Sequence, residues 1–81
     1  MTKFIITFGH GQLKGYDVDP LSVALVIPAS SAQEAREKVF LSAIGTGFCT
    51  HYPYNAYIEK FVHKYKMVEW SLDDLLAMRE E

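Results

Sequence analysis

The sequence contains only one cysteine, Cys49, so no disulfide can form within the chain. Small secreted domains usually depend on disulfides, whereas cytosolic proteins rarely contain them, and we therefore expect a cytoplasmic protein. Long hydrophobic runs are also lacking, since none approaches the roughly 20 residues of a membrane-spanning helix. The apolar run near the N-terminus is too short for a signal peptide, so the sequence predicts no membrane association.

An excess of basic charge is missing as well. Eight Lys and Arg residues stand against ten Asp and Glu residues, which gives a formal net charge of −2. This balance argues against a nucleic-acid backbone as the main partner, because such proteins usually present a basic face. The charge is uneven, with two basic and five acidic residues between positions 66 and 81. The strongest electrostatic signal therefore lies near the C-terminus.

Hydrophobic residues, in contrast, make up 49% of the chain and aromatic residues 14%, which excludes a disordered tail. Eighty-one residues allow one hydrophobic core, so we expect a single domain over residues 1–81. β-Branched and aromatic runs predict strands at 3–8, 22–27, 48–54 and 66–70. Apolar residues at helical spacing predict helices at 32–44, 55–65 and 72–81, of which 55–65 could also be read as a strand. The order β-β-α-β-α-β-α predicts an α+β domain with helices against a mainly antiparallel sheet.

Local signals mark several ends of these elements. Pro28 is expected to end the second strand, and Gly45 and Gly47 to stop the first helix. Ser31 and Glu34 have the spacing of a capping box, in which each side chain binds the other residue's backbone N–H. Asn55 and Ser71 are the corresponding N-cap candidates of the second and third helices.

The segment FGHGQ places His10 between Gly9 and Gly11, directly after the first strand. Glycines permit positive φ and close approach of a ligand, so residues 9–12 (Gly9, His10, Gly11 and Gln12) form a candidate ligand loop. A dinucleotide fingerprint requires a different glycine spacing and a following helix, and neither is present. We therefore favour a tight turn with an exposed histidine.

Cysteine and histidine raise two further hypotheses. Zinc favours His and Cys ligands, but Cys49 and His51 form the only close pair, so we expect no metal and no cofactor. Cys49 is then expected to pack in the core. The alternative is a small hydrolase or transferase, in which His10 acts with Cys49 or His51 as a nucleophile–base pair.

Aromatic and basic residues are concentrated in the segment HYPYNAYIEKFVHKY, residues 51–65. Tyrosine is frequent at protein interfaces because it buries a large area and keeps a polar tip. With the tryptophan and the acidic residues at the last helix, the candidate interface comprises Tyr52, Tyr54, Tyr57, Lys60, Lys64, Trp70, Asp73 and Asp74. Two alternatives remain: Tyr57 and Tyr65 are partly buried helix positions, or the Tyr/Lys-rich segment 52–66 stacks nucleic-acid bases.

The stretches KFIITFGHGQ, S-x-x-E-A-R, HYPY and KYKMVEW together resemble small uncharacterised proteins that are encoded by bacteriophages and prophages. The resemblance covers most of the chain, but none of these motifs belongs to a named reaction. It implies a phage accessory protein that acts in the host cytoplasm by binding a bacterial host protein, for example as an inhibitor of a defence system. Our leading hypothesis is accordingly a non-enzymatic protein-binding module, and a homodimer is compatible with it.

Overall fold

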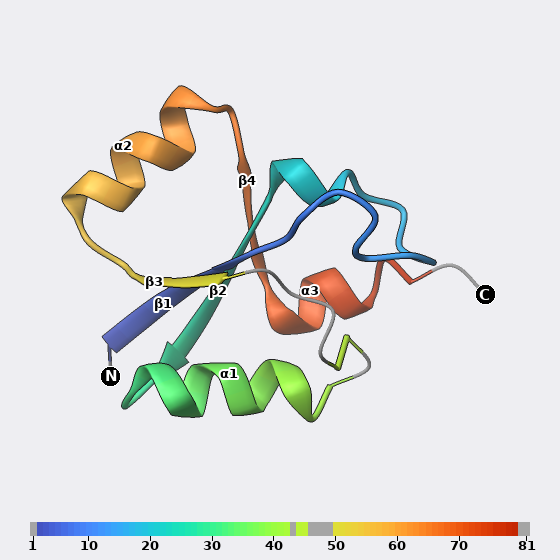
Figure 1. Cartoon of the computed structure of the whole chain (residues 1–81), viewed down its shortest axis with the longest axis horizontal. Coiled ribbons are helices and arrows are strands. Elements are labelled where there is room, and N and C mark those ends of the chain that lie inside the picture. Colours follow the sequence, from blue (N-terminus) through green and yellow to red (C-terminus); the bar gives the residue numbers. More distant parts are fainter. Residues whose placement is uncertain (1, 43, 46–49, 80–81) are drawn as a thin grey trace.

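A four-stranded sheet forms the centre of the molecule, with the strand order β3-β1-β2-β4 (Figure 1). The computed structural model describes residues 2–42, 44–45 and 50–79. The strands are β1 (Thr2–Thr7), β2 (Val23–Ala29), β3 (Thr50–Pro53) and β4 (Val68–Ser71). β1 pairs antiparallel with both β2 and β3, while β2 pairs parallel with β4. The sheet is therefore mixed but mostly antiparallel.

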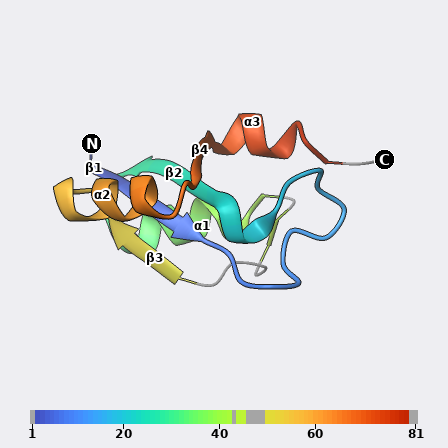
Figure 2. The same ribbon diagram turned by 90° about the horizontal axis from the view of Figure 1, so that it is seen from above.

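Three α-helices pack against this sheet, namely α1 (Ala32–Phe40), α2 (Ala56–Lys64) and α3 (Leu72–Leu76). A short 3₁₀ helix, η1 (Pro20–Ser22), precedes β2. Figures 1 and 2 show α1 and α2 on opposite sides of the sheet. The predicted α+β class and the order β-β-α-β-α-β-α are confirmed, and the segment 55–65 is helical. Among the described residues, no helix has the length and hydropathy to cross a membrane.

The two faces of the sheet bury unequal cores. On one face, Phe4 and Ile6 of β1 pack with Val39 of α1 and Leu75 of α3 in the larger cluster. On the other face, the buried cluster consists of Ile5, Ala24, Ile58 and Val62. This division follows from the alternation of side chains along β1, where successive residues point to opposite faces. α2 therefore rests on a much smaller apolar base than α1 and α3.

All three N-caps predicted for the α-helices are confirmed. The side chains of Ser31, Asn55 and Ser71 accept hydrogen bonds from backbone N–H groups three residues later, at 3.0–3.2 Å. The capping box is only half formed, because the Glu34 carboxylate accepts hydrogen bonds from the Ser30 hydroxyl and backbone N–H. These two bonds, with the nearby Lys38 ammonium, lower the pKa of Glu34 below its usual value.

Several predicted element ends are wrong. β2 continues through Pro28 to Ala29, because β4 pairs only with Val23–Val26 and leaves the edge beside Pro28 open. α1 ends at Phe40, well before Gly45, and the Ser42 hydroxyl donates to the Val39 carbonyl (2.5 Å) beyond it. β4 starts at Val68, since Lys66 adopts a positive φ of 53° after α2. α3 ends at Leu76. The predicted strand positions 48 and 49, including the expected burial of Cys49, lie outside the described residues.

Candidate functional site

α2 carries two neighbouring stripes of apolar side chains that have different environments. Ile58 and Val62 are buried against the sheet. Tyr57, Phe61 and Tyr65 are 75%, 41% and 57% exposed, although they recur at the same four-residue spacing. The interpretation of Tyr57 and Tyr65 as partly buried helix positions is therefore wrong. Tyr57, Phe61 and Tyr65 therefore form a row of exposed aromatic rings next to the buried stripe of α2.

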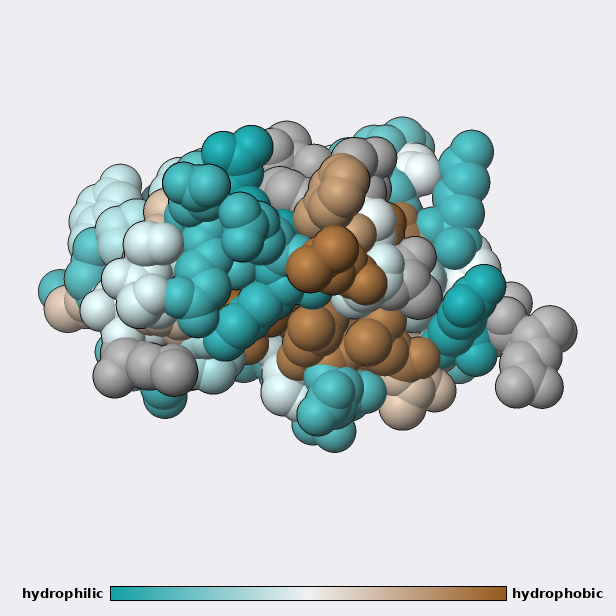
Figure 3. Space-filling model, turned by 90° about the horizontal axis from the view of Figure 1, so that it is seen from below, coloured by the Kyte–Doolittle hydropathy of each residue, from teal (hydrophilic) through white to brown (hydrophobic). Residues whose placement is uncertain are grey.

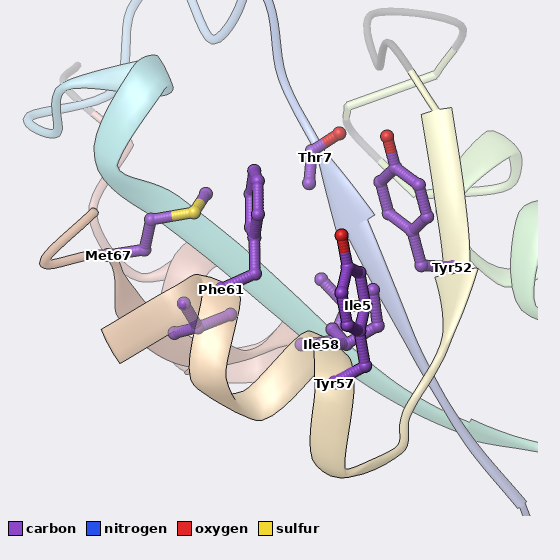
Figure 4. Close-up of a pocket in the computed structure, with 8 residues that line it drawn as sticks. Ile5, Thr7, Tyr52, Tyr57, Ile58, Phe61 and Met67 are labelled. Carbon is purple, nitrogen blue, oxygen red and sulfur yellow. The ribbon is translucent and has the colours of Figure 1, made fainter. Parts of the chain in front are cut away.

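A narrow hollow of about 170 Å³ lies between α2 and the strands β1 and β3. Ile5 and Thr7 of β1 lie between Phe61 on one side and Tyr52 of β3 on the other (Figure 4). Met67, which follows α2, lies beside Phe61. The antiparallel register opposes Ile5 to Tyr52, which explains how β3 supplies the second wall. Apolar atoms dominate the lining, and its polar side-chain atoms are the hydroxyl groups of Thr7, Tyr52 and Tyr57 (Figure 4).

Two wider hollows continue this surface along α2. One, of about 250 Å³, is lined by Leu21, Tyr65 and Met67 among others, and the other, of about 270 Å³, by Tyr57, Lys60, Phe61, Lys64 and Tyr65. Phe61 lines all three hollows, and its ring centroid lies 4.6 Å from that of Tyr65. We call the continuous surface formed by Leu21, Tyr52, Tyr57, Phe61, Tyr65 and Met67 the aromatic groove.

The outer border of the aromatic groove is basic. Lys60 and Lys64 are one helical turn apart and line the same hollow as Tyr57 and Phe61. The Lys64 ammonium lies 5.6 Å from the centre of the Tyr65 ring, a cation–π distance. Within the described part of the chain, neither lysine forms an ion pair. Both positive charges are therefore available to a ligand in the groove.

Tyr54 has a different environment from the other tyrosines of this segment. It is half-buried against the small core cluster, and its hydroxyl donates a 2.9 Å hydrogen bond to Glu69 of β4. This bond, assisted by desolvation and by the negative charges of Glu69 and Glu59, raises the pKa of Tyr54. The Tyr54 side chain thus connects the segment before α2 to β4, and we assign it a role in the fold and not in binding.

The sheet separates the remaining predicted interface residues, Trp70, Asp73 and Asp74, from the aromatic groove. Trp70 packs against the larger cluster on the opposite face, together with Leu72. Asp73 and Asp74 occupy the exposed first turn of α3, whose Leu75 is buried in that same cluster. The structure thus brings Tyr52, Tyr57, Lys60 and Lys64 together and places Trp70, Asp73 and Asp74 elsewhere.

The FGHGQ segment forms the predicted turn. The Gln12 backbone N–H donates to the Gly9 carbonyl (3.1 Å), and the Gln12 side chain accepts from the Gly9 N–H (2.6 Å). Gly11 has a φ of 86°, which a residue with a side chain rarely adopts. His10 is exposed at the tip. Both of these hydrogen bonds join Gly9 to Gln12 and close the turn.

His51 lies on the other side of the sheet from the aromatic groove. It lines a hollow of about 420 Å³ with residues of α1, including Arg36 and Glu37, and His10 is not among the lining residues. Cys49, the third member of the hydrolase hypothesis, lies outside the described residues. Among the residues that are described, no three His, Cys, Asp or Glu side chains are placed to hold a metal ion.

Sequence reasoning missed Phe61, Met67 and Leu21 as parts of the aromatic groove. The signal for Phe61 was present, because residues 57, 61 and 65 form a row that is distinct from the row of 58 and 62.

Comparison with protein-family models, curated proteins and solved structures finds no match to this chain. The geometry and charge of the aromatic groove are therefore the basis of the functional proposal.

Proposed function

We propose that this protein is a non-enzymatic binding module that docks a partner protein in the aromatic groove. The observation that carries the proposal is the continuous row of exposed rings from Tyr57 through Phe61 to Tyr65, which faces Tyr52 across a hollow. Aromatic residues are enriched in the cores of protein interfaces, where they supply much of the binding energy. A partner that covers this row would remove a large apolar area from water.

The groove has the form of a site that accepts side chains. Its narrow hollow is open at the surface and has an apolar base of Ile5, Ile58 and Val62. Pockets that receive an apolar anchor, surrounded by contacts that exclude water, are typical of binding hot spots. The hollow thus supports docking of a protruding side chain from another protein.

The resemblance of the sequence to bacteriophage and prophage products extends the proposal to the kind of partner. A small phage protein without its own chemistry can act by occupying a surface of a bacterial host protein. We include in the proposal that this host protein is bound in the cytoplasm, and a component of a defence system is one such target.

Affinity capture from a bacterial lysate tests the proposal, with the wild type and two double variants as baits. Tyr57→Ala with Phe61→Ala removes the centre of the aromatic groove. Phe40→Ala with Leu41→Ala is the matched control, because these residues are 55% and 81% exposed at the end of α1. Figure 3 shows the face on which α1 lies, where hydrophobic groups also gather beside a hydrophilic surface.

We expect the wild type and the control to retain the same protein, and the groove variant to lose at least nine-tenths of it, equivalent to about 1.4 kcal/mol. Equal retention by all three baits would remove the aromatic groove from the proposal. Retention of no protein at all would contradict the proposed function itself.

A further inference from the structure

We propose that the segment that occupies the aromatic groove is acidic and apolar, with a large apolar side chain in the narrow hollow and carboxylates on Lys60 and Lys64. This inference rests on the proposed function and specifies the chemistry of the partner. It follows from the way charge is distributed around α2 and from the chemistry of the hollow.

Charge on α2 is separated by the helical geometry. Successive residues are rotated by about 100°, which places Lys60 and Lys64 next to the aromatic row, on the side away from Ile58 and Val62. Glu59 lies on the opposite flank, where its charge acts on Tyr54. The groove side of the helix therefore carries positive charge without a compensating carboxylate among the described residues.

Unpaired lysines beside an apolar surface favour an anionic partner. A carboxylate that reaches either ammonium forms an ion pair at the border of the groove, and partner specificity in interfaces often depends on such complementary charges. A basic segment, in contrast, would place like charges together. The lysines thus select the sign of the partner's charge.

The narrow hollow selects an apolar side chain. Its described lining includes Ile5, Val62 and Met67 and contains no charged side chain. Tyr57 and Phe61 line both this hollow and the one that contains the lysines, so neighbouring residues of one segment can reach both. A segment in which Leu, Ile, Phe or Met stands next to Asp or Glu therefore fits the two hollows together.

The same lysines and rings are compatible with single-stranded nucleic acid, but the remaining observations favour a peptide. Sequence-tolerant nucleic-acid sites track the backbone with a positively charged groove. Here only Lys60 and Lys64 line the described hollows beside the rings, and the chain as a whole carries a net charge of −2. An apolar hollow with a basic border on one side fits an amphipathic acidic segment better.

Selection of peptides from a random library on the immobilised, full-length protein tests the inference. We expect enrichment of peptides in which Asp or Glu adjoins Leu, Ile, Phe or Met. The affinity of an enriched, fluorescently labelled peptide is then measured for Lys60→Glu with Lys64→Glu. We expect about tenfold weaker binding, because two border ion pairs are lost and replaced by repulsion.

A matched control separates local from overall charge. Lys14→Glu with Arg36→Glu changes the net charge by the same amount at exposed positions outside the groove hollows, and we expect an unchanged affinity for the peptide. The library is also applied to the groove variant with both lysines reversed, for which we expect enrichment of Lys or Arg in place of Asp or Glu. Far-ultraviolet circular dichroism verifies that each variant is folded.

Four outcomes would overturn the inference. Enrichment of apolar peptides without any charge preference would do so, while leaving the proposed function in place. An unchanged affinity of Lys60→Glu with Lys64→Glu for the enriched peptide would also overturn the inference and leave the proposed function in place. Binding of oligothymidylate that weakens with salt and requires these lysines, with no peptide enriched, would assign the groove to nucleic acid. Self-association that is abolished by Tyr57→Ala with Phe61→Ala would assign it to a second copy of the chain.

Discussion

Tyrosine residues of one short segment have three different environments, and these environments decide what each residue does. Tyr52 faces the narrow hollow from β3, and Tyr57 stands exposed at the start of α2. Tyr54 packs, half-buried, against the small core cluster, and its hydroxyl donates a hydrogen bond to the Glu69 carboxylate. Composition alone placed all three in one interface. Of these three tyrosines, only Tyr52 and Tyr57 belong to the proposed binding surface, together with Tyr65.

The Tyr54–Glu69 hydrogen bond leads to a prediction about titration. Replacement Glu69→Gln removes the negative charge that favours the protonated phenol, so the pKa of Tyr54 is expected to fall towards its usual value near 10. In the wild type the raised pKa adds stability that is present below pH 10. This contribution is lost as the pH rises through the pKa of the folded state. Spectroscopic titration of the phenolate, with the other tyrosines replaced by Phe, measures the shift.

Glu59→Gln is the control for this prediction. Glu59 acts on Tyr54 only through space and is the smallest of the causes, so we expect a smaller fall in the pKa of Tyr54 than with Glu69→Gln. Equal shifts in both variants would show that the field of the carboxylates, and not the hydrogen bond, raises the pKa.

At the scale of the element, α2 is unusual in the number of large side chains it leaves exposed. Its buried stripe has two members, Ile58 and Val62, whereas its aromatic stripe has Tyr57 and Phe61 within the helix and Tyr65 at the C-cap. The Asn55 cap stabilises the first turn, and Tyr54 and Met67 hold the two flanking segments against the small cluster. A helix supported in this way can present aromatic rings at its side without burying them.

The two stripes of α2 are expected to differ in their contribution to stability. Ile58→Ala leaves a cavity in a four-residue cluster and should lower the free energy of unfolding by about 2–3 kcal/mol. Tyr57→Ala removes an exposed ring and should change it by no more than about 0.5 kcal/mol. Urea unfolding of the two variants measures the difference. A loss at Tyr57 as large as that at Ile58 would show that the aromatic row stabilises the fold and is not reserved for binding.

For the whole molecule, one sheet is shared by two clusters of unequal size. The larger cluster contains residues from β1, β2, α1 and α3, so it connects the N-terminal and C-terminal parts of the chain. A domain of this length has a total stability of roughly 4–12 kcal/mol, so the loss of one large core side chain, about 2–5 kcal/mol, removes a large fraction of it. The molecule is therefore expected to unfold as a unit.

The variant Leu75→Ala tests whether the molecule unfolds in a single cooperative transition. Leu75 is fully buried between α3 and the sheet, so we expect a loss of about 3 kcal/mol in the free energy of unfolding. Fluorescence of Trp70, the only tryptophan, reports on the same cluster, and far-ultraviolet circular dichroism reports on all helices. The two signals should have one common midpoint in urea, in the variant as in the wild type.

Separate midpoints would contradict a single cooperative unit. In particular, a transition in the dichroism signal that precedes the change in Trp70 fluorescence would indicate that α2 and its small cluster unfold first. Hydrogen exchange of the α2 backbone amides would then identify the element involved.

The sequence by itself determined the kinds of elements, their order and the starts of the α-helices. These depend on signals within a few residues, such as the caps at Ser31, Asn55 and Ser71 or the β-branched run of β1. Each cap accepts a hydrogen bond from a backbone N–H only three residues later. Element ends were less predictable. Pro28 is tolerated inside β2 only because β4 stops short of it, which is a property of the neighbouring strand.

The tertiary structure alone decided which of the two stripes on α2 is buried. Both stripes have helical spacing and apolar side chains, so local periodicity is the same for each. The choice depends on where the sheet lies relative to α2, and the second wall of the hollow depends on the pairing of Ile5 with Tyr52 across more than forty residues. Long-range pairing of this kind leaves no periodic trace in the sequence, and for that reason the aromatic groove became visible only in the folded chain.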